Sequence, residues 1–132
     1  MEGSVSLSKG PVIERGHHLV DGAWRRPAEG GTLPVVDPST GETFGHIARG
    51  TRADVDAAIA AADRAFATGW GVWEAVERGR ALARLGRLIA EHHETLWRLE
   101  ARDTGKPLAQ AKADIVACAR YFEFYGGACD KH

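Results

Sequence analysis

The sequence predicts a short antiparallel β region followed by about four α-helices, in a chain that is mostly α-helical. Three observations predict this order. Four of the five prolines and nine of the sixteen glycines lie in the first 50 residues, whereas 19 of the 22 alanines come later. Proline and glycine favour turns, and alanine is the best helix former. After residue 50, apolar residues also recur every three or four positions, as they do on one face of a helix.

Length and charge narrow the class of protein. The chain has 132 residues, enough for one domain at most or for part of a larger one. A nucleic-acid partner is not expected, because the pI of about 6.6 indicates no basic surface. Neither a secretory signal nor a run of roughly 18 apolar residues for a membrane span is found. Two cysteines without a disulfide framework favour a reducing compartment, so we expect a cytoplasmic protein.

The β region is expected to follow a flexible tail over residues 1–17, which shows no useful periodicity. Asp21-Gly22 lies between two short apolar pairs. It predicts a two-residue β-hairpin, because both central positions of such a turn need positive φ.

A second pair of strands is predicted over residues 33–36 and 43–47. The Asp37–Glu42 segment between them has turn chemistry throughout: aspartate to bond back onto the chain, proline to fix φ and glycine for the left-handed position. Pro34 indicates that its strand lies at a sheet edge.

The first helix is predicted to begin after Thr51 and to end by Gly69. Thr51 is a good N-cap, and Asp54 three residues later approximates a capping box. Behind them, apolar residues form a stripe along one face: Val55, Ala58, Ile59, Ala62 and Phe66.

Three more helices are predicted, over about 75–92, about 94–102, and from Pro107 to the Gly126-Gly127 pair, which weakens or ends the last one. The residues expected to face inward are apolar and lie at helical spacing: Leu82, Leu85, Ile89, Leu96, Leu99, Leu108, Ala111, Ile115, Ala119 and Phe122. Another face of the second helix, expected to be solvated or to face a partner, carries Arg80, Arg84 and Arg87.

Residue chemistry alone gives no active site. Cys118 and Cys129 do not have zinc-ligand spacing, and on one helix they would lie about 16 Å apart, too far for a disulfide. Both are interpreted as structural residues, since a nucleophilic thiol needs a nearby base or cation. The pairs His17-His18 and His92-His93 cannot both face one metal, and no phosphate-binding glycine motif occurs.

The order of short motifs carries more information than any one of them. The motifs occupy residues 19–24, 36–42, 49–51, 77–80, 99–107 and 119–128. In this order and spacing, residues 18–132 resemble the N-terminal part of the NAD(P)-dependent aldehyde dehydrogenase superfamily, an α/β family.

This resemblance implies a longer protein that oxidises an aldehyde to a carboxylic acid with NAD or NADP, through a cysteine thiohemiacetal. Residues 18–132 would then be the N-terminal segment of a coenzyme-binding domain and would lack its Rossmann-like sheet. The family's catalytic and nucleotide-binding segments lie after the position of His132, so no catalytic or cofactor-binding residue is carried over. The 132-residue chain alone is expected to be inactive. The implied partners are the remainder of the polypeptide and, in the whole protein, further copies in a homodimer or homotetramer.

The resemblance also implies a site for a monovalent cation such as K⁺ or Na⁺. Its ligands in this chain would be the main-chain carbonyls of Val35 and Val36 and the side chain of Asp103. Hard cations prefer such oxygen ligands. In the alternative interpretation, Asp103 accepts hydrogen bonds from the backbone of the loop at Thr104 and Gly105.

Two hypotheses about function remain open. The chain is part of a dehydrogenase, which its abrupt end at residues 130–132 favours, or it is a stand-alone, non-catalytic remnant that acts as an interaction module. In either case we expect an uncovered apolar face and marginal stability, because a helical layer must bury its stripe against another layer.

Overall fold

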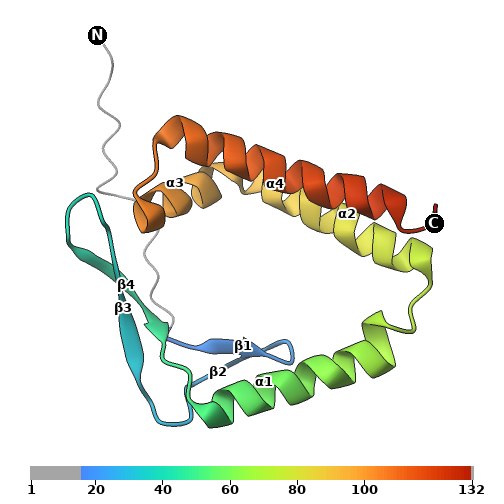
Figure 1. Ribbon diagram of the computed structural model, residues 1–132, viewed down its shortest axis with the longest axis horizontal. Coiled ribbons are helices and arrows are strands. Elements are labelled where there is room, and N and C mark those ends of the chain that lie inside the picture. Colours follow the sequence, from blue (N-terminus) through green and yellow to red (C-terminus); the bar gives the residue numbers. More distant parts are fainter. Residues whose placement is uncertain (1–15, 132) are drawn as a thin grey trace. The chain divides into compact units, whose positions relative to one another are not determined.

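The computed structural model describes residues 16–131 (Figure 1), so most of the tail predicted over residues 1–17 lies outside the described residues. The described chain divides into two compact units. The hairpin unit comprises residues 16–36 and 43–74, and the helical unit comprises residues 37–42 and 75–131. Short strands come first and helices follow, which confirms the predicted order.

The hairpin unit begins with β1, His18–Val20, and β2, Ala23–Arg25, which pair antiparallel. The two turn residues between them both have positive φ, 56° at Asp21 and 70° at Gly22. This backbone is that of a type I′ turn, whose twist matches the twist of the strands. The first predicted hairpin is confirmed.

The second hairpin pairs β3, Thr32–Val36, with β4, Thr43–Ala48. Each described sheet has two strands, so Pro34 lies on an edge strand as predicted. The register shifts between Val35 and Val36, so β3 is irregular just before the turn that follows it.

The helix α1, Arg52–Ala65, begins as predicted. The Asp54 carboxylate accepts hydrogen bonds from the backbone N–H and from the hydroxyl of Thr51, both at 2.9 Å. These bonds satisfy a donor at the end of the helix that would otherwise be left unpaired, and they fix where the helix begins.

The end of this helix differs slightly from the prediction. A π-helical turn, η2, continues α1 directly over Phe66–Trp70, one residue beyond the expected limit at Gly69. The N–H of Gly71 donates to the carbonyl of Phe66, five residues earlier, which closes the wider turn.

The apolar stripe of α1 is exposed in the described residues. Val55, Ile59 and Phe66 are 52%, 55% and 67% accessible, while the buried residue of α1 is Ala61. The β1–β2 hairpin approaches α1 at Asp54 and Arg64 instead (Figure 1). The hairpin unit therefore does not bury the stripe that the sequence pattern defines.

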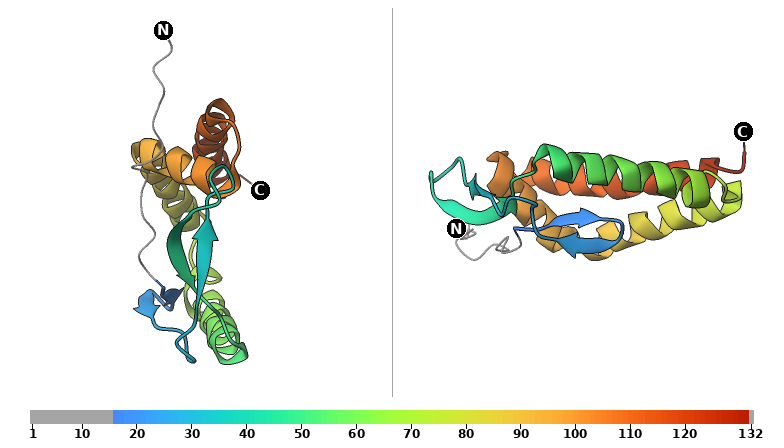
Figure 2. Two further views of the ribbon diagram at one scale, coloured as in Figure 1. Left: turned by 90° about the vertical axis from the view of Figure 1, so that its left-hand side faces the viewer. Right: turned by 90° about the horizontal axis from the view of Figure 1, so that it is seen from below.

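The helical unit contains α2, Ala75–Glu91, α3, His93–Thr104, and α4, Leu108–Ala128. α2 and α4 run antiparallel and side by side, as Figures 1 and 2 both show. α4 ends at Ala128, one residue after the Gly126-Gly127 pair that was predicted to weaken or end the last helix.

Glycines allow α2 and α4 to approach closely. A Cβ atom at Gly126 would lie 2.9 Å from the carbonyl oxygen of Gly79, and one at Gly86 would lie 2.9 Å from that of Ala119. Real Cβ atoms are not found so close to other heavy atoms, so these positions accept glycine alone without a shift of the helices. Packing against α2 offsets the low helix propensity of Gly126 in the last turn of α4.

The core of the helical unit is built around Trp97, which is 1% accessible and packs with Ala101 and Ala111. Its indole N–H donates to the Glu94 carboxylate at 2.9 Å, and Lys112 lies 4.6 Å from the ring centroid. Leu96 and Leu99, which were predicted as the buried residues of this helix, are only half-buried. The large ring has the deepest position because its polar N–H has a partner there.

The other inward-facing predictions are met in part. Ala111 and Ala119 are buried, and Leu108 and Ile115 pack on the core around Trp97. The inward placement of Leu85 is wrong: it is exposed, since its neighbour Gly86 occupies the close approach to α4.

Among the residues that the structure describes, no helix has the length and apolar character needed to cross a lipid bilayer.

Candidate functional site

The turn Asp37–Glu42 and the loop between α3 and α4 both belong to the helical unit. Asp37 organises the turn. Its carboxylate accepts a hydrogen bond from the N–H of Ser39 at 2.9 Å, and its carbonyl accepts one from the N–H of Gly41 at 2.8 Å. The N–H of Asp37 donates to the carbonyl of Glu42, which closes the turn.

Asp37 also forms an ion pair with α3. Its Oδ2 lies 3.5 Å from Nε of Arg102, and the two side chains are 8% and 13% accessible. A carboxylate so deeply buried needs a charged partner, because water no longer solvates it. Arg102 supplies that charge and joins the turn to the last part of α3.

Gly105 is the contact point of the loop with the turn. Its φ of 70° ends α3 in the left-handed conformation, and its N–H donates to the carbonyl of Ala101 at 2.9 Å. A Cβ at this position would lie 2.8 Å from Cγ of Pro38. Backbone conformation and the proximity of Pro38 therefore both require glycine here.

Lys106 connects the two helices on either side of the loop. Its ammonium group donates hydrogen bonds to Glu100 of α3 and to Asp114 of α4, the latter at 3.0 Å. These two hydrogen bonds raise the pKa of Lys106. The loop N–H of Lys106 donates to the hydroxyl of Thr104.

The cluster of Asp37, Arg102, Gly105 and Lys106, called the turn–loop cluster below, is a structural joint. Its carboxylate, guanidinium and ammonium groups are bound to one another or to neighbouring side chains. No thiol, histidine or hydroxyl poised as a nucleophile belongs to it. The charged groups of the cluster are engaged in ion pairs, and these pairs join the turn to α3 and the loop to α3 and α4.

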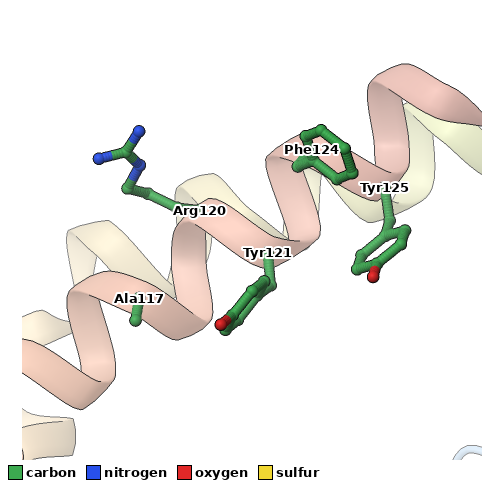
Figure 3. Close-up of a pocket in the computed structure, with 5 residues that line it drawn as sticks. All are labelled: Ala117, Arg120, Tyr121, Phe124 and Tyr125. Carbon is green, nitrogen blue, oxygen red and sulfur yellow. The ribbon is translucent and has the colours of Figure 1, made fainter.

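A second candidate surface lies on α4. Five side chains line an open hollow of about 470 Å³ (Figure 3): Ala117, Arg120, Tyr121, Phe124 and Tyr125. Tyr121 and Tyr125 are one turn apart and project from the same side of the helix, and the Phe124 ring meets that of Tyr125 edge to face at 5.2 Å. The three aromatic side chains are 60–69% accessible. Such an exposed aromatic surface is typical of an interface.

The cysteines fit the structural interpretation. Both are free and half-buried. The thiol of Cys129 donates to the carbonyl of Tyr125, one turn earlier on α4. Among the described residues, no group of three histidine, cysteine, aspartate or glutamate side chains could hold a metal ion.

The predicted cation ligands belong to different units. Val35 and Val36 end β3 in the hairpin unit, and Asp103 lies in the helical unit with an exposed side chain. The loop N–H of Lys106 binds Thr104 and not Asp103. The cation site stays a prediction.

Two glycine-rich motifs that often hold a dinucleotide are missing from this sequence. A helix N-terminus binds pyrophosphate when a glycine-rich loop leads into it, and the sequence contains no G-x-G-x-x-G or P-loop motif. We therefore assign no nucleotide contact to this chain.

Sequence reasoning missed the ion pair of Asp37 with Arg102 and the bridging role of Lys106. Each joins residues from different elements, so the pairing depends on tertiary structure. One signal was available for Asp37: an aspartate directly after a strand and before Pro-Ser-Thr-Gly needs partners for its carboxylate if the turn is buried.

The comparisons with known proteins agree with the motifs. A sequence profile of the aldehyde dehydrogenase family matches residues 24–132. Aldehyde dehydrogenase family 2 member B4 from Arabidopsis thaliana, a mitochondrial protein, is 42% identical over 125 residues. The alignment covers 92% of this chain and 23% of the plant protein.

Two solved structures are similar in both sequence and fold. A Burkholderia cenocepacia protein, provisionally described as an aldehyde dehydrogenase, is 56% identical with a TM-score of 0.84, over 87% of this chain and 24% of its own. Betaine aldehyde dehydrogenase from Staphylococcus aureus, solved as a double mutant with NAD⁺, is 34% identical with a TM-score of 0.85. That match covers 91% of this chain and 24% of the other.

The chain thus spans about a quarter of the length of the relatives that it matches. The family profile covers most of the sequence, and the strands and helices of the described residues superpose on those of solved members. This chain belongs to the aldehyde dehydrogenase family.

Proposed function

We propose that the chain is the N-terminal part of an NAD(P)-dependent aldehyde dehydrogenase, with residues 18–132 forming the first segment of its coenzyme-binding domain. The observation that carries the proposal is the continuous match of residues 24–132 to that family, at about a quarter of the relatives' length. The exposed apolar faces of α1 and α4 support it, since both suit burial against further polypeptide.

The reaction proposed for the whole protein is the oxidation of an aldehyde to a carboxylic acid, through a thiohemiacetal on a cysteine outside this chain. Cys118 and Cys129 are not that cysteine. Both lie on or at the end of α4 and away from a helix N-terminus, which would lower a thiol pKa. Neither belongs to the turn–loop cluster, where the cationic side chains of the motifs gather. This chain's own contribution is a scaffold: it holds motif loops in place and presents packing surfaces.

The proposal is tested by measuring NADH formation with aliphatic, aromatic and hydroxylated aldehydes. We expect NADH from the natural gene product and none from the isolated 132 residues. In the natural protein, Cys118→Ala and Cys129→Ala should keep kcat within about twofold of the unmodified enzyme. NADH formation by the isolated chain, or loss of activity on replacing either cysteine, would contradict the proposal.

A second candidate function is a non-catalytic interaction module. The exposed aromatic surface of α4 favours it, because the same side chains could bind a separate protein. The intact mass of the natural gene product separates the two. A mass near that of the matched relatives supports the dehydrogenase, and a mass near 14.2 kDa supports the module.

Further properties of the whole protein are proposed on the resemblance alone. They are a K⁺ or Na⁺ ion bound by the carbonyls of Val35 and Val36 and by Asp103, and a homodimeric or homotetrameric assembly. A cytoplasmic location is proposed instead from the two cysteines, which form no disulfide framework. Replacement of K⁺ and Na⁺ by choline should lower the melting temperature of the natural protein but not that of its Asp103→Asn variant. An equal response of the two proteins to choline would count against the site.

A further inference from the structure

The hollow on α4 has a single wall, because the five side chains that line it all come from this one helix (Figure 3). Its three aromatic side chains, Tyr121, Phe124 and Tyr125, are 60–69% accessible. On the opposite side of the helix, Ala119 and Gly126 are buried against α2. A helix that is apolar on both sides is typical of the interior of a larger protein, so a second surface is expected over the aromatic side chains.

Arg120 is the charged residue among the five that line the hollow. It lies between two apolar residues of α4, Val116 one turn before it and Phe124 one turn after it, which are 51% and 69% accessible. Within the described part of the chain, its guanidinium group has no ion pair. A surface that covers the aromatic side chains takes water from this group as well, and a charge without water needs an opposite charge beside it.

Glu123 is the acidic residue nearest to Arg120 along the described part of α4. The spacing of three residues is one at which opposite charges on a helix can pair. The Glu123 side chain lies toward α2 instead: its Cγ atom would be 3.1 Å from a Cβ at Gly86, and it lines a separate hollow between α2 and α4. A counter-charge for Arg120 therefore has to come from the surface that covers the aromatic side chains.

Polypeptide of the same protein is the occupant that the comparisons favour. The solved relatives match this chain over only 24% of their own length, so most of each relative lies outside the match. A covalently attached segment has a high effective concentration at the surface, which favours it over a second copy or a separate protein. This step rests on the proposed function, in which the chain is the first part of a longer dehydrogenase.

We propose that the aromatic surface of α4 is an intramolecular docking surface. A segment beyond residue 132 covers Tyr121, Phe124 and Tyr125 with apolar side chains and pairs an aspartate or glutamate with Arg120. The aromatic rings supply most of the buried apolar area. The ion pair fixes the position of the segment along the helix, because a guanidinium group binds a carboxylate in a defined geometry.

Carbodiimide cross-linking of the natural protein tests this ion pair. The reagent joins an amine to a carboxylate in contact with it, so Arg120→Lys keeps the positive charge and makes position 120 reactive. Denaturing electrophoresis separates single chains from linked pairs of chains, and mass spectrometry of each band identifies the linked peptides. We expect a link within one chain, from position 120 to an aspartate or glutamate beyond residue 132, at least about tenfold more abundant than any link between chains.

Two controls make the outcome specific. Lys106 Nζ lies 3.0 Å from Oδ2 of Asp114, so a link between these two residues shows that the reagent has reacted. Arg84→Lys, at an exposed position of α2 without an acidic residue one turn away, should give little product. A link from position 120 to Glu123 or to a second chain, or equal yields at positions 84 and 120, overturns the proposal. So does the absence of a link from position 120 in a sample where Lys106 and Asp114 are joined.

NADH formation by the same Arg120→Lys protein separates this inference from the proposed function. An active dehydrogenase without the link contradicts the docking surface alone. A natural gene product with a mass near 14.2 kDa contradicts both, because it has no segment beyond residue 132.

Discussion

Asp37 and Arg102 are the residues of the helical unit whose charges are most deeply buried as a pair. Their side chains are 8% and 13% accessible, and Asp37 also anchors the turn through Ser39. Removing one charge leaves the other without its partner in a poorly hydrated place, which costs more than the pair contributes.

We therefore predict that Asp37→Asn lowers the free energy of unfolding by about 2 kcal/mol, because the amide keeps an acceptor for Ser39 but loses the charge facing Arg102. Urea unfolding followed by circular dichroism measures it. Asp130→Asn is the matched control, since its pair with Lys131 is exposed and should contribute little to the free energy of unfolding. Equal effects of the two substitutions would contradict the importance of the buried pair.

Gly105 and Gly41 allow backbone strain to be separated from steric contact. Both have positive φ, 70° and 76°, but a Cβ would meet Pro38 only at Gly105. Gly41→Ala should lower the free energy of unfolding by about 1 kcal/mol, because alanine is strained in the left-handed conformation. Gly105→Ala should lower it by about 1–3 kcal/mol more, because the added Cβ also overpacks against Pro38. Thermal unfolding of the two variants gives the comparison. Equal losses of stability in the two variants would show that Pro38 does not constrain the loop.

Lys106 gives a pH-dependent contribution whose sign follows from its environment. Glu100 and Asp114 raise its pKa, so its stabilisation is fully present below the ordinary value of 10.5 and is lost as pH rises through the higher folded value. Lys106→Met should destabilise the protein at pH 8 and have a smaller effect near pH 11. The urea midpoints of the variant and of the unmodified protein, measured at the two pH values, test this prediction. A difference between the two midpoints that grows with pH would refute it.

At the scale of elements, the pairing of α2 with α4 depends on small residues at the contact. Gly79, Gly86 and Gly126 occupy positions where a Cβ would approach a backbone carbonyl within 3 Å. Gly127, one residue further along, has no atom within 4 Å of such a Cβ. Adjacent glycines on the same helix therefore have opposite roles.

Substitution by alanine should separate these roles. Gly126→Ala should destabilise the protein by about 1–3 kcal/mol, since α2 must move away. Gly127→Ala should stabilise it by about 0.5–1 kcal/mol, because alanine is the better helix former. Melting temperatures of the two variants measure the difference. Stabilisation by both would mean that the helices are not in close contact at Gly126.

Local chemistry explains which elements could be predicted from the sequence. The Asp21-Gly22 turn, the Thr51 cap and Pro107 act through their own neighbours, so the hairpin and the starts of α1 and α4 were predicted correctly. The close approach of Gly126 to Gly79 was not predicted, because it joins two helices and depends on tertiary packing.

The candidate site was less predictable for the same reason. The motif order identified the turn and the loop, but the ion pair of Asp37 with Arg102 joins residues 65 positions apart. The burial of Trp97 could not be predicted from the sequence pattern either, since it depends on the contacts of the ring with Glu94 and Lys112. Long-range pairing of this kind is set by tertiary packing, which periodicity does not encode.

At the scale of the whole molecule, the chain presents more apolar surface than its own units cover. The stripe of α1 and the aromatic surface of α4 are both exposed, with side chains 52–69% accessible. Solved members of the family are about four times as long as the matched segment. We attribute the exposed faces to contacts that the rest of such a protein would provide.

Urea unfolding of the isolated 132-residue chain, followed by circular dichroism, tests this claim most directly. Exposed apolar faces predict a broad transition with an m-value below the range of about 1–3 kcal/mol/M that is usual for small domains in urea. A sharp, cooperative transition with an m-value well within that range would show that the chain completes its own core, and would contradict the account.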